Sequence, residues 1–129
     1  MIRPYPLEQQ PTVLIVEDDE PTRDAMAELL ASEGYLVMTA AGAHDALSLL
    51  QTPPSRIDVV LLDVHLPDGN GTHLCARLRE LYPELPVVVC TGQADAAEAA
   101  ELLRLGVQRY FRKPVSLEEL LATVESALG

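Results

Sequence analysis

The sequence has few cysteines and no long apolar run. Cys75 and Cys90 are too few for a disulfide framework, and their spacing matches no metal-ligand or redox motif. We therefore expect both to be buried, reduced thiols. Apolar runs such as Val13–Val16 are far shorter than the roughly 20 residues of a membrane-spanning helix, so we expect no membrane association.

Basic residues are also scarce. The chain has 9 Lys and Arg residues against 20 Asp and Glu residues, which gives a formal net charge of -11. A charge of this sign and size repels nucleic acid and anionic lipid at long range. The composition therefore predicts a protein that does not bind nucleic acid directly.

The length of 129 residues fits one domain with a substantial core. Residues 1–11 are proline-rich and lack the basic start and apolar stretch of a secretory signal. We expect this segment to be a loose extension, residues 12–129 to form a single domain, and the protein to be cytoplasmic. The sequence is compatible with a stand-alone protein and with a piece of a longer one.

Short, mostly β-branched apolar runs recur along the chain, and amphipathic segments lie between them. The runs are residues 13–16, 36–38, 59–62, 87–90 and 107–111. Such runs are typical of parallel strands covered on both faces. Helical spacing and boundary signals, such as Ser116 with Glu119, mark five helices between and after them. The alternation predicts an α/β fold, a doubly wound parallel sheet of five strands with helices on both faces.

Charged and polar residues follow four of the five predicted strands. Glu17–Glu20 follow the first strand, Asp63 the third, Thr91 the fourth and Lys113 the fifth. In open parallel sheets, the loops at the carboxyl ends of the strands build the functional site. Converging carboxylates repel one another unless a cation lies between them, and Mg²⁺ prefers a few carboxylates with waters and phosphate oxygens. A carboxylate nucleophile, metal-binding acids, a hydroxyl and a lysine are the groups that phosphoryl transfer requires.

Each of these residues alone has an ordinary structural explanation. Asp19 or Glu20 can serve only as a helix cap, a threonine at a strand end is usually structural, and Lys113–Pro114 alone is a solvated turn. The functional interpretation depends on the whole ordered set.

That ordered set resembles the receiver domain of two-component response regulators, from about Thr12 to the carboxyl terminus. The four segments that carry the resemblance are Val13–Glu20, Leu61–Gly71, Val87–Gly92 and Tyr110–Pro114. The resemblance implies a flavodoxin-like (βα)₅ sheet with strand order 2-1-3-4-5. It also implies a phosphorylation-dependent signalling switch rather than a dedicated enzyme.

The resemblance assigns a role to each site residue. Asp63 is the expected phosphoacceptor, Thr91 and Lys113 are expected to contact the phosphoryl oxygens, and Thr91 with Tyr110 forms the expected conformational switch. The expected cofactor is Mg²⁺ or Mn²⁺. Its expected ligands are Glu17, Asp18, Asp63 and the backbone carbonyl of His65.

The resemblance also implies partners. A sensor histidine kinase or a histidine phosphotransfer protein would donate the phosphoryl group, and a downstream protein or domain would respond to it. The family's output face is usually the fourth helix, fifth strand and fifth helix, here about 94–128, which leaves a homodimer or another partner open. His65 and Gln93 occupy positions that influence phosphoryl loss in this family, with the direction of the effect open.

Three alternatives fit the sequence less well. A pseudo-receiver, an interaction module that is never phosphorylated, would lack an acid or the lysine, and neither is missing. A phosphohydrolase of the haloacid dehalogenase type uses Asp-x-Asp, whereas this chain has Asp63-Val-His65. A nucleotide-binding domain needs a glycine-rich turn after the first strand, where the acidic Glu17–Glu20 stands.

Overall fold

The computed structural model describes residues 10–51, 56–92, 95–113 and 116–129, in which seven strands and five helices are assigned. The strands are β1 (Thr12–Val16), β2 (Leu36–Ala40), β3 (Val59–Leu62), β4 (His65–Leu66), β5 (Gly69–Asn70), β6 (Val87–Thr91) and β7 (Arg109–Arg112). The helices are α1 (Glu20–Ser32), α2 (Ala43–Gln51), α3 (Gly71–Leu81), α4 (Ala96–Arg104) and α5 (Leu117–Leu128). Predictions that concern Gln93, Ala94, Pro114 and the first nine residues lie outside the described residues.

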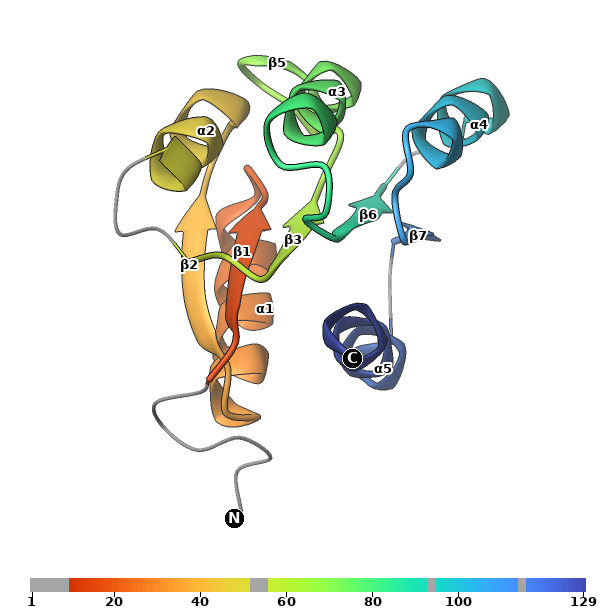
Figure 1. The fold of residues 1–129 in the computed structure, drawn as a ribbon. Coiled ribbons are helices and arrows are strands. Elements are labelled where there is room, and N and C mark those ends of the chain that lie inside the picture. The colour runs from red at the N-terminus through yellow and green to blue at the C-terminus, as the bar shows by residue number, and fades with distance from the viewer. Residues whose placement is uncertain (1–9, 52–55, 93–94, 114–115) are drawn as a thin grey trace.

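Five strands form one parallel sheet in the order β2-β1-β3-β6-β7 (Figure 1). With the short β4–β5 pair left aside, this is the predicted order 2-1-3-4-5, so the predicted fold class is confirmed. The order reverses direction between β1 and β3, where the chain crosses from one half of the sheet to the other. Open α/β sheets bind ligands at such a switch point, at the carboxyl ends of the strands.

Helices cover both faces of the sheet. Figure 1 shows α2, α3 and α4 on one side and α1 and α5 on the other. Alternate residues of each central strand face opposite layers, so that Leu14 and Val60 join the core under α2–α4, whereas Ile15 and Leu61 join the core under α1 and α5. Every residue of β3 and β6 is buried, which explains why these strands are apolar throughout.

The predicted helix boundary signals act as expected. Asp19 and Ser116 cap α1 and α5, since each side chain accepts a hydrogen bond from a backbone N–H of the first turn. Gly34 and Gly106 follow the ends of α1 and α4 with φ of 98° and 89°. These positive values favour glycine, because a side chain is strained in that region.

Several strand boundaries differ by one or two residues from the predicted ones. The last strand was predicted over 107–111 but begins at Arg109, because Val107 belongs to the turn after α4, where its N–H bonds to Leu102. The second strand extends to Ala40, two residues beyond the predicted end. The antiparallel pair β4–β5, which the sequence analysis did not anticipate, lies between β3 and α3.

The residues just before β1 already belong to the domain. Leu36 N–H donates to the carbonyl of Pro11, and the Gln10 side-chain amide donates to the carbonyl of Gly34 at 2.6 Å. The predicted domain boundary at Thr12 stays a prediction, although Gln10 and Pro11 already bond to residues of the domain. Across the described parts of the chain, none of the helices has the length and apolarity needed to span a bilayer.

Candidate functional site

The candidate site lies at the carboxyl ends of β1 and β3, which are neighbours in the sheet. Asp63 N–H donates to the carbonyl of Val16 at 2.9 Å, and Glu17 N–H donates to the carbonyl of Ala40 at 3.0 Å. These bonds continue the strand ladders by one residue and fix both acidic residues beside each other. The expected convergence of the two acidic segments is therefore confirmed.

Three carboxylates meet there. One oxygen from each of Glu17, Asp18 and Asp63 lies within 4.8 Å of the others. Glu17 and Asp63 are only 2% and 8% exposed, whereas Asp18 faces solvent. The acidic cluster is therefore buried at Glu17 and Asp63 and accessible to water at Asp18. This donor set of hard oxygens fits a magnesium-type ion, which keeps some of its waters.

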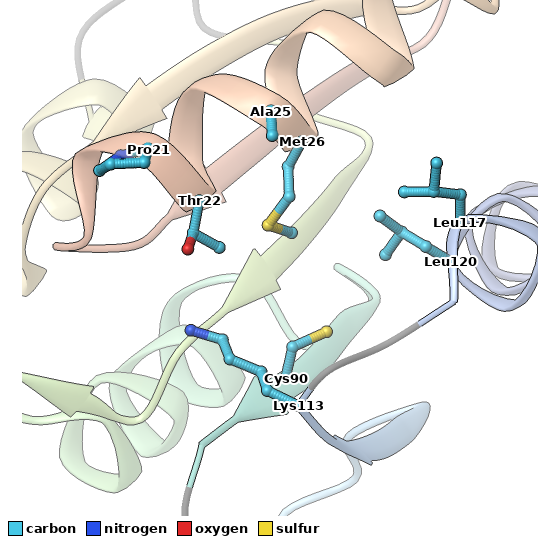
Figure 2. Close-up of a pocket in the computed structure, with 8 residues that line it drawn as sticks. All are labelled: Pro21, Thr22, Ala25, Met26, Cys90, Lys113, Leu117 and Leu120. Atoms are coloured by element: carbon cyan, nitrogen blue, oxygen red, sulfur yellow. The ribbon is translucent and has the colours of Figure 1, made fainter.

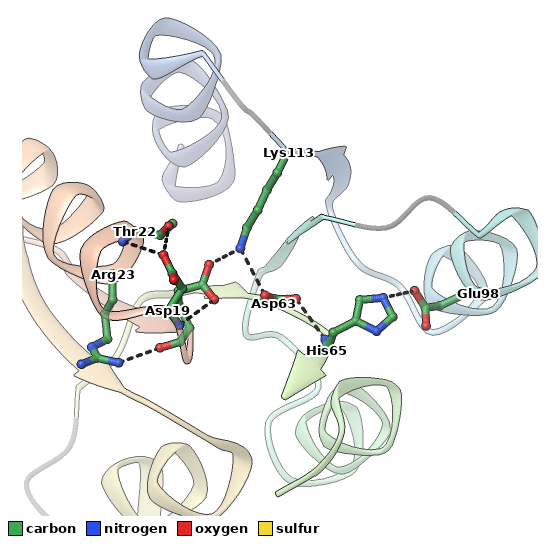
Figure 3. Close-up of polar contacts among 8 residues, drawn as sticks. Asp19, Thr22, Arg23, Asp63, His65, Glu98 and Lys113 are labelled. Carbon is green, nitrogen blue, oxygen red and sulfur yellow. Dashed lines mark hydrogen bonds and ion pairs between the residues drawn. The ribbon is translucent and has the colours of Figure 1, made fainter. Parts of the chain in front are cut away.

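Lys113 reaches this cluster from the end of β7 (Figure 3). Its ammonium group donates to the carboxylates of both Glu17 and Asp63, and the bond to Asp63 is 3.1 Å long. The backbone N–H of Lys113 donates to the carbonyl of Thr91 at 2.7 Å, which ties the lysine to the end of β6. One cation therefore partly offsets the charge of two buried carboxylates.

The pKa values of this group reflect burial and mutual charge. Burial raises the pKa of Glu17 above its ordinary value, and the nearby Asp63 adds to the rise while Lys113 opposes it. Burial by itself lowers the pKa of Lys113, but hydrogen bonds and charge from Glu17 and Asp63 outweigh it and raise that pKa overall. Lys113 therefore stays charged at neutral pH, and a charged lysine can bind phosphate oxygens.

The two expected switch residues lie on adjacent strands. Thr91 ends β6 and is fully buried, and Tyr110 lies in β7, half-buried. Burial raises the pKa of Tyr110, and the charges of Glu98 and Asp95 add to the rise against a backbone hydrogen bond at Asp95. Tyr110 thus stays a neutral phenol near the amino end of α4.

The loop after β1 has its own hydrogen bonds. Asp19 is the N-cap of α1 and accepts from the backbone N–H of Thr22 at 3.1 Å, as one of the structural explanations predicted. The Arg23 guanidinium donates to the carbonyl of Glu17 at 3.0 Å (Figure 3). These contacts fix the conformation of the acidic loop, in which Asp18 is exposed.

The loop after β3 contains two contacts that sequence reasoning missed. Asp68, between β4 and β5, accepts from the backbone N–H groups of Ala43 and His44 at 2.8 and 3.0 Å and so caps α2. His65 N–H donates to Asp63 Oδ1 at 3.0 Å, while its imidazole lies 3.5 Å from the Glu98 carboxylate on α4. The contacts of Asp68 with α2 and of His65 with Glu98 join residues that are far apart in the sequence, and no local signal pointed to Asp68 or Glu98.

A largely apolar cavity of about 620 Å³ opens between α1 and α5, next to Lys113 (Figure 2). Met26 and Ala25 line it from α1, Leu117 and Leu120 from α5, and Cys90 from β6. Both cysteines are free and buried, as predicted.

Fold and site together define a class: doubly wound domains with an acidic pocket and a lysine at the carboxyl edge of the sheet. Residues 13–125 match the response regulator receiver domain family. The chain belongs to this family, and it is thereby a receiver domain of two-component signalling.

Two solved structures and one curated relative illustrate the similarity. A CheY-like receiver domain protein from Methanospirillum hungatei JF-1 is 31% identical, with a TM-score of 0.88 over 93% of this chain and 94% of that one. The non-phosphorylated HemR receiver domain from Leptospira biflexa is 33% identical, with a TM-score of 0.84 over 93% and 95%. Response regulator MprA of Mycolicibacterium vanbaalenii is 35% identical over 90% of this chain and 49% of its own length. The chain thus spans about half the length of the curated relatives that it matches.

Proposed function

We propose that this domain is a magnesium-dependent phosphorylation switch whose phosphoacceptor is Asp63. The observation that carries the proposal is the position of Asp63, with Glu17 and Asp18 on one side and the Lys113 ammonium at 3.1 Å on the other. Membership of the receiver family supports it, because signalling by phosphorylation is the activity of that family. Lys113, together with a cation held by the acidic residues, would neutralise the charge of an incoming phosphoryl group.

The proposed reaction takes a phosphoryl group from a phosphohistidine. A lone pair of the Asp63 carboxylate attacks phosphorus, the phosphorus–nitrogen bond breaks, and the histidine nitrogen keeps the electron pair and gains a proton from solvent. The product is an acyl phosphate on Asp63. The Lys113 ammonium group, which already donates to Asp63, would donate to the new phosphoryl oxygens, and the Thr91 hydroxyl would donate to them as well.

The proposed ligands of the metal ion are Glu17, Asp18, Asp63 and the carbonyl of His65. When bound, Mg²⁺ or Mn²⁺ would neutralise charge on the phosphoryl oxygens. The donor set consists of oxygens alone, which suits such hard cations. The residues of this chain supply the nucleophile, its orientation through the N–H of His65, and the second positive charge at Lys113.

The proposed output passes from Thr91 to Tyr110. Thr91 would move toward the phosphoryl group, and Tyr110 would turn from half-buried to buried in the space released. Tyr110 lies in β7, between α4 and α5, so we propose the α4–β7–α5 surface as the output face. The downstream protein or domain, or a second copy of this chain, would bind there.

The proposed phosphodonor is a sensor histidine kinase or a histidine phosphotransfer protein, so we propose a cytoplasmic location, where both would meet the domain. Since the chain covers half of its curated relatives, the output and process of the whole protein are part of this proposal.

The test is intact mass after incubation with acetyl phosphate or phosphoramidate, with Mg²⁺ or with EDTA. We expect a gain of one phosphoryl group in the wild type with Mg²⁺ and no gain in Asp63→Asn, because an amide is not a nucleophile. Asp68→Asn, in the same loop, is the matched control and should still be labelled. Labelling of Asp63→Asn would contradict the assignment, and no labelling of the wild type by any donor would favour the pseudo-receiver.

A further inference from the structure

The His65 side chain is directed away from the phosphoacceptor, although its backbone binds it. His65 N–H donates to Asp63 Oδ1 at 3.0 Å, whereas the imidazole extends in the other direction, to α4 (Figure 3). There His65 Nε2 lies 3.5 Å from Glu98 Oε1. The residue two positions after the acceptor is thus held at the edge of the site by a different element.

The environment of Glu98 favours a contact with the His65 imidazole. Its side chain is 18% exposed, and its Oε1 is buried without a hydrogen-bond partner among the residues that the structure describes. A buried carboxylate oxygen without a donor costs free energy, so any approach of His65 Nε2 is favoured. The separation of 3.5 Å between Nε2 and Oε1 is longer than a usual hydrogen bond, so the two side chains can still move closer together.

Glu98 is fixed by the structure of α4. It lies in the first turn, where its backbone N–H donates to the Asp95 side chain at 3.2 Å. Asp95 is the N-cap of α4, so the position of Glu98 depends on how α4 begins. Burial raises the pKa of Tyr110 in β7, and the charge of Glu98 adds to the rise, so this carboxylate interacts with β7 as well as with His65.

We infer that Glu98 is a positioning residue that keeps the His65 side chain away from the phosphoryl group and thereby lengthens the lifetime of the phosphorylated form. The inference rests on the proposed function of Asp63. Two observations carry it: the His65 imidazole lies 3.5 Å from Glu98, and Glu98 Oε1 is buried without a hydrogen-bond partner among the described residues.

The chemistry concerns hydrolysis of the acyl phosphate. Water attacks phosphorus, the bond between phosphorus and the Asp63 oxygen breaks, the carboxylate is restored, and the proton of the water passes to solvent. An imidazole free to turn toward the phosphoryl group can accept a hydrogen bond from that water and orient it. While His65 is bound to Glu98, the water lacks this acceptor.

This arrangement links the lifetime of the phosphorylated form to α4. A partner that shifts the first turn of α4 moves Glu98 and changes the position of His65. Because coupling between two sites is reciprocal, the state of the Asp63 site also biases α4. The contact is therefore a route between the phosphoryl site and the output face that does not pass through Thr91.

The kinetic test measures the half-life of phosphorylated protein after removal of donor, at constant pH. Glu98→Ala should shorten it by about fivefold, the change expected for loss of one net hydrogen bond. Glu98→Gln should remain close to wild type, since its amide oxygen can still accept from His65. Glu101→Ala, which removes an exposed carboxylate from the same helix, is the control and should have no effect.

The double variant shows whether the effect passes through His65. We expect His65→Ala to have the same half-life with and without Glu98→Ala. An unchanged or longer half-life in Glu98→Ala would overturn the inference. So would an equal shortening by Glu98→Ala in the presence and absence of His65.

A second measurement does not depend on phosphorylation. In the unphosphorylated protein, the ¹⁵N and ¹H signals of the His65 imidazole should shift in Glu98→Ala and stay in place in Glu101→Ala. If the wild type cannot be phosphorylated but these signals shift in Glu98→Ala, the proposed function is wrong and the contact between His65 and Glu98 is confirmed. If phosphorylation succeeds and the signals do not shift, the inference fails by itself.

Discussion

Lys113 shows how much of the site depends on a single side chain. Glu17 and Asp63 are buried side by side, and the ammonium group of Lys113 binds both. Buried charges are tolerated when they are paired and hydrogen-bonded. A phosphoryl group on Asp63 would compete with Glu17 for the same ammonium group, so phosphorylation would change the local pairing before it moves any helix.

Cys90 is a buried titratable residue beside this cluster. It precedes Thr91 on β6, and burial raises the pKa of its thiol to about 12 from an ordinary value of 9.0. The thiol therefore stays protonated in the folded protein at pH values at which it ionises in the unfolded chain. Its contribution to stability is fully present below pH 9 and is lost as the pH rises toward 12.

We predict that this titration appears in the pH dependence of stability. Between pH 8 and pH 10, the wild type should lose about 1.4 kcal/mol of unfolding free energy through Cys90, and Cys90→Ala should not. Urea unfolding followed by circular dichroism at both pH values measures the difference. Val89→Ala, an adjacent core truncation without a titrating group, should keep the wild-type slope. Identical slopes in Cys90→Ala and wild type would contradict the prediction.

The loop between β3 and α3 is the element in which sequence and structure differ most. It was expected only as a phosphorylation loop, but it contains the β4–β5 pair and closes on itself where the N–H of Gly71 donates to the carbonyl of Val64 at 2.8 Å. Asp68 fastens the same loop to the start of α2. The loop is therefore fixed at its middle by Asp68 and closed by the bond between Gly71 and Val64, and its first part holds the bond from His65 N–H to Asp63.

Gly71 is required here by close contact between backbone segments. A Cβ at this position would lie 2.3 Å from the Cα of Val64, and no flexible side chain can move to relieve that clash. We predict that Gly71→Ala destabilises the domain by about 2 to 3 kcal/mol. Equilibrium urea unfolding measures this loss.

Gly92 provides the matched control for Gly71. Among the residues that the structure describes, a Cβ at Gly92 meets nothing within 4 Å, so Gly92→Ala should leave the unfolding free energy nearly unchanged. Equal effects of the two substitutions would show that the loop closure at Gly71 is not the cause.

At the scale of the whole molecule, the net charge of -11 and the buried acidic cluster both oppose compaction. A cation at the cluster relieves part of this repulsion. We predict that Mg²⁺ at about ten times its dissociation constant raises the unfolding free energy by about 1.4 kcal/mol, because it binds only the folded site. Thermal unfolding at constant ionic strength, with Na⁺ in place of Mg²⁺ as reference, measures the shift.

The specificity of this stabilisation depends on the cluster. Asp18→Asn should remove most of the Mg²⁺ effect, whereas Asp24→Asn, an exposed position on α1, should retain it. If both variants respond as the wild type does, the stabilisation comes from general charge screening, and the proposed metal site is wrong.

The sequence by itself determined the number and order of the principal elements. Apolar runs such as Val59–Leu62 can be satisfied only by burial on both faces, and local signals such as Ser116 and Gly106 mark where helices begin and end. The convergence of Glu17 with Asp63 was expected on the condition that the first and third strands are neighbours, which the family resemblance implied and the pairing of β1 with β3 confirms. The sequence was less informative about strand boundaries: Val107, in a turn after a glycine, resembles the start of a strand, but β7 begins at Arg109.

Only the tertiary structure decided which distant residues meet. Lys113 binds Glu17 as well as Asp63, Asp68 caps α2, and Glu98 approaches His65, and none of these pairs is local in the chain. Periodicity and capping signals act over one or two turns, whereas these contacts depend on how the loops pack once the sheet has formed. The candidate site was therefore predictable from residue types at strand ends, whereas the partners Asp68 and Glu98, which lie far away in the sequence, were not.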